Sequence, residues 1–189
     1  MDFKVGQKVS YPNHGVCAVE SIEKKEAGGS QADFYTLRVL ANNSAIYVPE
    51  MNARTIGIRP VINSLQCGEV IKFLGDDFTE GSADWKIRVR DYSAKIQSGD
   101  IFETAEVLKQ LTFLTYSKQL SFREQRLLEK AKFLVVSELA VVCSQSECEI
   151  EKRVDRLYLF GQQRKAGPKT PVSKSNNCFS CRSLDYFFS

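Results

Sequence analysis

Trp85 and the basic residues that follow it are the side chains of this chain best suited to contact nucleic acid. Trp85 is the only tryptophan, and Lys86, Arg88 and Arg90 alternate with apolar residues directly after it. An apolar side chain can wedge against a base step while cations beside it hold phosphates, without any reading of the bases. A lone tryptophan can equally be a core residue or an anchor between domains, because it brings a large apolar area. The residues alone leave both roles open.

Residue types suited to catalysis or metal binding are scarce. His14 is the only histidine and falls in a predicted turn. Cys178 and Cys181 have the spacing of a metal-binding pair, but no second pair completes the tetrahedral set that structural zinc requires. No glycine-rich phosphate loop is present. We therefore expect no enzyme, no metal, no cofactor and no small-molecule substrate. A redox switch at Cys178 and Cys181 stays open as an alternative.

The distribution of charge argues against tight binding to bare DNA. The chain has 189 residues, with 26 Lys or Arg and 23 Asp or Glu. The basic excess lies wholly in residues 161–189, and phosphate neutralisation supplies most non-specific binding to DNA. No apolar run approaches the ~20 residues of a membrane span, and the first residues do not resemble a secretory signal. We expect a cytoplasmic protein without membrane contact.

Residues 1–55 are predicted to form a small all-β domain. Runs rich in strand-forming residues lie at 8–11, 16–22, 34–40 and 45–48. Turn-forming residues separate them at 12–15, 28–30 and 42–43. Pro49 should end the last strand, because it cannot donate to a ladder. Four or five short strands predict an SH3-like or Tudor-like barrel, too small for an internal ligand, so that its faces and edges carry its function.

Residues 60–160 are predicted to form a compact all-α domain that carries Trp85. Helix starts are expected at Asp84, at Asp100 and at the capping box of Ser121 and Glu124. Further helices are expected near 61–74 and around Ile150, Val154 and Leu157. Residues 161–189, rich in Gly, Pro, Ser and Lys, are predicted to be a disordered basic tail. The predicted fold class is thus α+β, a β-barrel followed by helices and a tail.

Several segments together resemble the CarD/CdnL family of bacterial RNA polymerase-binding proteins, which shares its first domain with the transcription-repair coupling factors. They are residues 3–22, Glu80–Trp85, Gln97–Asp100, Leu120–Glu124 and Lys130–Lys132. The resemblance covers about residues 3–145. It implies that 1–55 bind the RNA polymerase β subunit and that 60–160 contact promoter DNA. At the matching place such proteins have a tryptophan, followed by basic residues, at the upstream edge of the transcription bubble.

The resemblance also implies a polymerase-facing set on the barrel, made of Lys25, Val39, Tyr47 and Pro49. An exposed strand edge there could be extended by a strand of the partner. Val39 could instead be core and Lys25 a solvated charge. Two positions depart from the family pattern: Ile87 stands where relatives often have a basic residue, and Tyr47 where some have an arginine.

The expected function is therefore that of a transcription regulator which stabilises the promoter open complex. Trp85 would lean into the minor groove without sequence preference, with Lys86, Arg88 and Arg90 on phosphates. The alternative is a protein–protein adaptor with a Tudor-like barrel, whose helices never touch DNA and whose Trp85 is buried.

Overall fold

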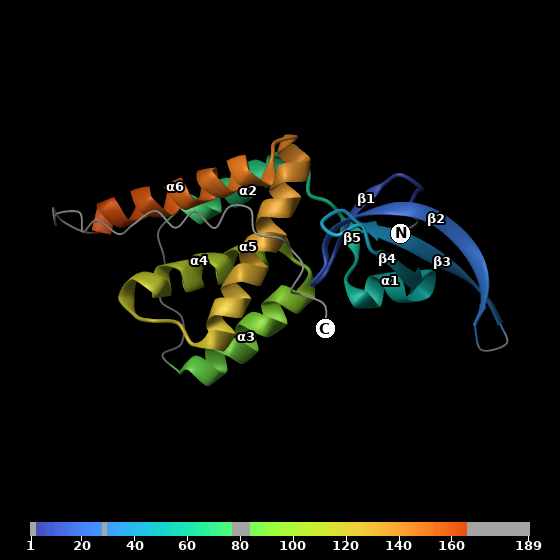
Figure 1. The fold of residues 1–189 in the computed structure, drawn as a ribbon, viewed down its shortest axis with the longest axis horizontal. Coiled ribbons are helices and arrows are strands. Elements are labelled where there is room, and N and C mark those ends of the chain that lie inside the picture. Colours follow the sequence, from blue (N-terminus) through green and yellow to red (C-terminus); the bar gives the residue numbers. More distant parts are fainter. Residues whose placement is uncertain (1–2, 28–29, 77–83, 166–189) are drawn as a thin grey trace.

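The computed structural model describes residues 3–27, 30–76 and 84–165. A curved antiparallel sheet lies at one end of the molecule and a group of packed helices at the other (Figure 1). The strands are β1 (Lys8–Tyr11), β2 (Gly15–Ala27), β3 (Ser30–Val39), β4 (Ala45–Pro49) and β5 (Arg59–Pro60). The helices are α1 (Glu50–Ile56), α2 (Ser64–Gly75), α3 (Trp85–Ser98), α4 (Ile101–Ser117), α5 (Phe122–Cys143) and α6 (Glu147–Lys165).

The turns between the first strands form where the sequence predicts them. Asn13 and Gly15 both adopt positive φ, 70° and 82°, between β1 and β2. Asn43 does the same, at 58°, between β3 and β4. These residue types tolerate the left-handed region better than most. The predicted turn at 28–30 falls largely outside the described residues.

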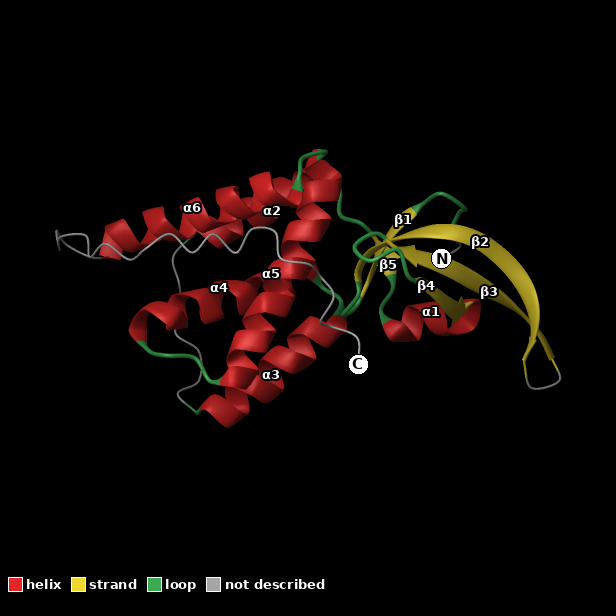
Figure 2. Cartoon of the chain, in the orientation of Figure 1, coloured by secondary structure: helices red, strands yellow, loops and turns green. Residues whose placement is uncertain are grey.

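The sheet is open, which corrects the expectation of a closed barrel. Its strand order is β4-β3-β2-β1-β5, so that β4 and β5 are its two edges in the described part of the chain. The apolar face is covered by a helix instead of by closure. After Pro49 the chain enters α1, which the sequence analysis missed, and Ala53 of α1 and Ile58 join the apolar cluster of the sheet. The β2–β3 ribbon also extends farther than predicted (Figure 2).

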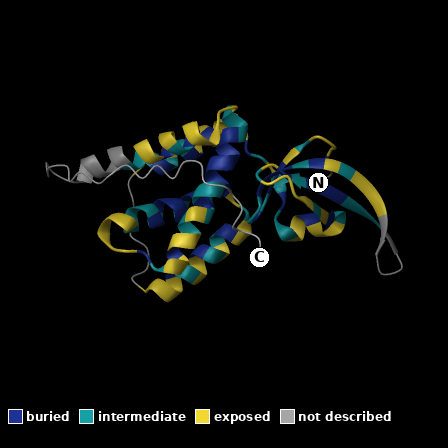
Figure 3. Cartoon of the chain, in the orientation of Figure 1, coloured by how far each residue is buried: buried dark blue, intermediate teal, exposed yellow. Residues whose placement is uncertain are grey.

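The helices begin at the residues that were predicted to cap them. Asp84 and Asp100 accept hydrogen bonds from the backbone N–H of Lys86 and Phe102, and Ser121 forms its capping box with Glu124. A further capping box, at Asn63, starts α2. Buried residues from α2 to α6 share one apolar core (Figure 3).

The last helix runs farther than predicted, because α6 extends to Lys165 into the segment expected to be disordered. The rest of that segment, with Cys178 and Cys181, lies outside the described residues. The predicted boundary at residue 55 stays a prediction, although β5 adds residues 59 and 60 to the sheet by pairing with β1. None of the described helices has the length and apolar character of a membrane span.

Candidate nucleic-acid and protein-docking surfaces

Trp85 lies at the surface, at the first residue of α3. Its side chain is 43% exposed, and it belongs to neither apolar cluster. Asp84 fixes the start of the helix, since its carboxylate accepts from the N–H of Lys86 at 2.8 Å. The ammonium of Lys86 lies 5.9 Å from the centroid of the indole ring. This placement removes the support for a buried Trp85, on which the adaptor alternative depended.

Arg88 is buried, which does not fit the phosphate contact that we expected of it. Its side chain is 4% exposed, and its guanidinium donates to the carboxylate of Glu124 at 2.7 Å. Glu124 also accepts from the backbone N–H and the hydroxyl of Ser121, at 2.9 and 2.7 Å. The buried ion pair of Arg88 therefore connects α3 to the start of α5 and fixes the helix on which Trp85 lies.

The charge of Glu124 is maintained by these donors. Burial alone would raise the pKa of this carboxyl, but the hydrogen bonds from Arg88 and Ser121 outweigh it and lower the pKa below its usual value. Glu124 is thus ionised at neutral pH and can pair with the guanidinium of Arg88, which a buried ion pair requires.

Lys86 and Arg90 are the exposed cations of α3. The side chain of Arg90 is 80% exposed, and its Nε lies 3.4 Å from the carboxylate of Asp91. Lys86 is exposed as well. Residues four apart share one side of a helix, so Lys86 and Arg90 lie together, and of the two it is Lys86 that reaches the indole ring of Trp85. Ile87, at 42% exposure, adds apolar area between them.

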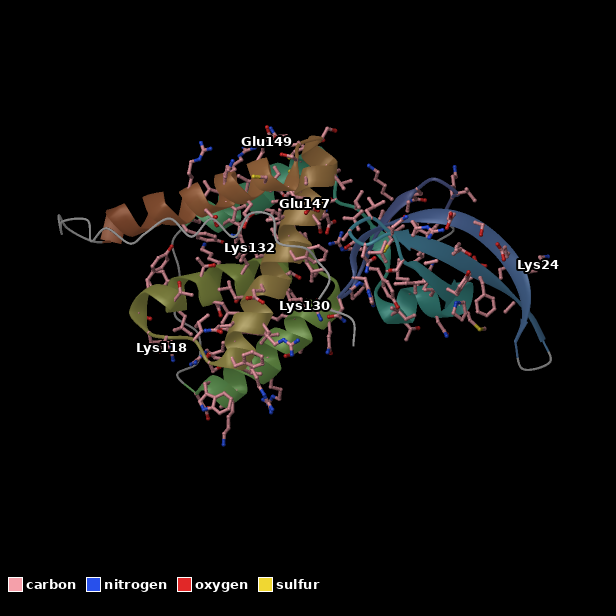
Figure 4. All side chains as sticks on the ribbon, in the orientation of Figure 1. Lys24, Lys118, Lys130, Lys132, Glu147 and Glu149 are labelled. Carbon is pink, nitrogen blue, oxygen red and sulfur yellow. The ribbon has the colours of Figure 1, made fainter. Side chains whose placement is uncertain are left out.

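The start of α5 adds an aromatic residue and cations that sequence reasoning missed. Phe122 is 70% exposed, with the guanidinium carbon of Arg126 5.5 Å from its ring centroid. Arg123 is exposed beside it, and Lys118 lies in the loop that leads into α5 (Figure 4). The ion pair between α3 and α5 places this group near Trp85. The predicted capping box could have indicated that Phe122 is exposed, because it puts Phe122 at the start of the helix, outside the apolar stripe.

Of the four residues expected to face the polymerase, the structure places some at the surface and one in the core. Tyr47 is 57% exposed on β4, and Pro49 is half-buried at the end of the same strand. Val39 is only 2% exposed within the core of the sheet, which corrects its expected role at the surface. Lys25 lies on β2 opposite Ala32, and its side chain is outside the described part.

The edge strand β4 is the feature suited to docking a partner. It pairs with β3 on one side and forms the edge of the sheet on the other. An edge strand offers backbone groups that a strand of another protein can join. Met51, 78% exposed on α1 directly after β4, adds an apolar side chain that sequence reasoning missed.

No metal-binding group occurs among the described residues, where no three His, Cys, Asp or Glu side chains come together. His14 stacks on Tyr11 with ring centroids 4.9 Å apart. Burial, and secondarily the charge of Lys130, lower the pKa of His14.

Taken together, the fold and these surfaces define a class of two-part binding protein, in which a sheet with an open edge is joined to helices that present an aromatic residue among cations. Comparison with known sequences identifies the family. The model of the CarD-like/TRCF RID domain matches residues 3–62, and that of the CarD C-terminal domain matches 69–155. The chain belongs to the CarD/CdnL family, whose members are transcription regulators that interact with RNA polymerase.

Two relatives illustrate the similarity. The putative transcription factor YdeB of Bacillus subtilis (strain 168) is 31% identical over 153 residues, which cover 79% of this chain and 97% of the relative. The 72-residue N-terminal domain of Myxococcus xanthus CarD, solved by solution NMR, is 39% identical. That match covers 31% of this chain and 79% of the domain, with a TM-score of 0.28.

Proposed function

We propose that this protein docks on the β subunit of bacterial RNA polymerase and stabilises the promoter open complex at the upstream edge of the bubble. The observation that carries the proposal is the exposed Trp85 at the start of a helix that is fixed from within by a buried ion pair. In this proposal residues 1–55 form the polymerase-interacting domain and residues 60–160 the DNA-contacting domain.

The DNA contact is made by the start of α3. The indole of Trp85 leans against a base step from the minor groove, and Lys86 and Arg90 hold the phosphates beside it. Arg88 acts indirectly, because its ion pair with Glu124 sets the direction of α3. Phe122 and Arg126, at the start of α5, widen the same surface. Contacts of this type do not read base sequence.

The polymerase contact is made by the edge strand β4. A strand of the β subunit adds to the sheet there, with main-chain hydrogen bonds providing affinity and side chains providing specificity. Tyr47 and Met51 are the large apolar side chains exposed at this edge and just beyond it. The loss of a ladder donor at Pro49 limits the length of the added strand.

The two contacts act together because the polymerase brings the helices to the promoter. A tethered module binds at a high effective concentration, so that weak affinity for bare DNA is sufficient. If the protein binds the open state better than the closed one, it shifts the equilibrium toward opening. A coupling of ~1–3 kcal/mol corresponds to about 5- to 150-fold.

The test uses purified bacterial RNA polymerase with wild-type protein and two single variants, Trp85→Ala and Leu65→Ala. Leu65 is a matched control, since it is 81% exposed but lies on α2. Polymerase affinity and the lifetime of the open complex after a heparin challenge are measured for each. We expect all three to bind polymerase equally and only Trp85→Ala to lose the prolonged lifetime.

The outcomes separate the two contacts. Tyr47→Ala should weaken polymerase binding itself, because it alters the docking edge. If wild-type protein does not bind polymerase, the whole proposal is wrong. If it binds without any change in open-complex lifetime, the docking edge stands and the DNA contact is refuted.

A further inference from the structure

Arg59 joins the sheet to the helices through a buried carboxylate. Its guanidinium donates to both oxygens of Glu138 of α5, at 2.6 and 2.9 Å, and its Nε donates to the carbonyl of Gly99 at 2.7 Å. Glu138 is only 2% exposed and also accepts from the Ser10 hydroxyl at 3.3 Å and the Ile62 N–H at 3.0 Å. A single arginine thus connects β5, the end of α3 and α5.

The backbone around this ion pair approaches too closely for a side chain. A Cβ added to Gly99 would lie 2.9 Å from the carbonyl oxygen of Gly57 and 2.9 Å from Cγ of Pro12. Gly57 and Gly99 both have positive φ, 89° and 78°. A Cβ on Gly15 would lie 3.2 Å from the ring of Phe133 on α5. Turns from the sheet part and from the helical part therefore meet without an intervening layer.

An ion pair of this kind specifies geometry more than it adds stability. Fork-like donation to both carboxylate oxygens restricts the angle as well as the distance. Replacing a buried ion pair by apolar residues is often neutral for stability. The four donors on Glu138 come from β1, from β5 and from the start of the segment that leads to α2. They define where α5 lies against the sheet.

The same helix α5 fixes both ends of α3. Glu124 binds Arg88 near the start of α3, and Glu138 binds Arg59, which in turn holds Gly99 at its end. α3 has 14 residues, which is about 21 Å from Gly99 to Trp85. A tilt of about 10° at Gly99 would displace Trp85 by about 3.6 Å, which is comparable to the ~3.4 Å between neighbouring base pairs.

We propose that Arg59 and Glu138 form a positioning joint that fixes Trp85 relative to the edge strand β4. The proposal rests on the function proposed above, and it adds that neither residue touches DNA or polymerase. Docking of β4 then sets where Trp85 lies on the promoter, because the two parts turn as one body. Loss of the joint should leave both contacts intact but uncouple them.

The first test follows the motion of the free protein and needs no polymerase. Backbone ¹⁵N relaxation gives separate rotational correlation times for the sheet and for the helices in wild type, Arg59→Met and Glu138→Gln. Arg38→Met is the matched control, since Arg38 forms an ion pair with Glu20 at 2.8 Å on the surface of the sheet. We expect one common correlation time for wild type and the control, and two shorter ones for the joint variants.

The second test measures polymerase affinity and open-complex lifetime with the same proteins. We expect unchanged affinity and a lifetime shortened by about fivefold or more, the low end of the proposed coupling. If a joint variant fails to fold, Arg59→Lys keeps the charge but loses two-pronged donation, and it should show a smaller change in the same direction.

The two tests can refute the joint and the proposed function independently of each other. A common correlation time in folded Arg59→Met and Glu138→Gln would overturn the joint, whatever the protein does to promoters. Separate correlation times with an unchanged open-complex lifetime would overturn its positioning role. If wild-type protein itself does not prolong the open complex, the proposed function has failed, while the relaxation data still decide whether the joint exists.

Discussion

Replacing Arg88 by methionine should destabilise the protein far more than the same change at Arg90, two residues away. Methionine keeps most of the apolar stem but removes the guanidinium that pairs with Glu124 at 2.7 Å. Removing one partner of a buried ion pair costs about 3–5 kcal/mol, because the other charge stays buried without compensation. Arg90→Met should change stability by less than about 0.5 kcal/mol, since Arg90 is 80% exposed.

The assay is urea-induced unfolding followed by far-UV circular dichroism at neutral pH. With a slope of about 2 kcal/mol per molar urea, Arg88→Met should lower the midpoint by about 2 M. The double variant Arg88→Met with Glu124→Gln removes the unpaired charge and keeps a residue suited to the capping box. It should regain at least half of the lost stability.

Two results would refute this reasoning. A loss of less than about 1 kcal/mol in Arg88→Met would show that the pair is not a buried, compensated one. A double variant as unstable as the single variant would show that the cost does not come from the charge of Glu124. The first result would reopen a role for Arg88 at the DNA surface, and the second would assign its structural role to packing instead of to the charge pair.

Three single features of the fold can each be tested by a change of sequence or by chemical labelling. The pKa of Glu124 is lowered in the folded state, so the stability that its charge contributes is fully present above the ordinary carboxyl pKa and is lost as pH falls through the lowered value. Urea midpoints measured at decreasing pH should therefore fall less steeply for Arg88→Met than for wild type. Gly99→Ala should lower the free energy of unfolding, measured by heat or urea, by at least about 1 kcal/mol, because Gly99 has a positive φ and close contacts. Gly68→Ala, in a helix with nothing within 4 Å of the added Cβ, should raise it by up to about 1 kcal/mol, and equal effects of the two changes would contradict the close contact. Iodoacetamide should label the exposed Cys148 well before Cys17 and Cys67, whose pKa values burial raises to about 12, and mass spectrometry of a time course would detect any other order.

The starts of the helices could be predicted from the sequence because their signals are local. Asp84, Asp100 and Ser121 each satisfy backbone donors within three residues, so no tertiary information is needed. Helix α1 was not predicted because it lacks such a local signal. Its N-cap is Pro49, which forms no side-chain hydrogen bond, and the helix has only 7 residues. The open sheet depends on α1 covering the apolar face, which is a tertiary effect.

The role of Arg88 could not be predicted because its partner is far away in the chain. The alternation of cationic and apolar residues after Trp85 suggested a row of exposed cations, but α3 has a helical period. Arg88, Tyr92 and Ile96, four residues apart, form its buried side. Glu124, which compensates the buried charge, is 36 residues from Arg88. Arg90 falls outside this stripe, and its exposure agrees with the helical period. Trp85 lies in line with the stripe and is nevertheless exposed, as the first residue of the helix.

Photo-crosslinking from position 85 tests the central proposal most directly. The photoreactive amino acid p-benzoylphenylalanine replaces Trp85 in one protein and the exposed Leu65 of α2 in a control. Each is irradiated with promoter DNA, with and without RNA polymerase, and the crosslinked bases are mapped. We predict crosslinks from position 85 at the upstream edge of the bubble, only when polymerase is present, and none from position 65. Crosslinks from position 85 to polymerase alone, or to DNA regardless of polymerase, would contradict the account.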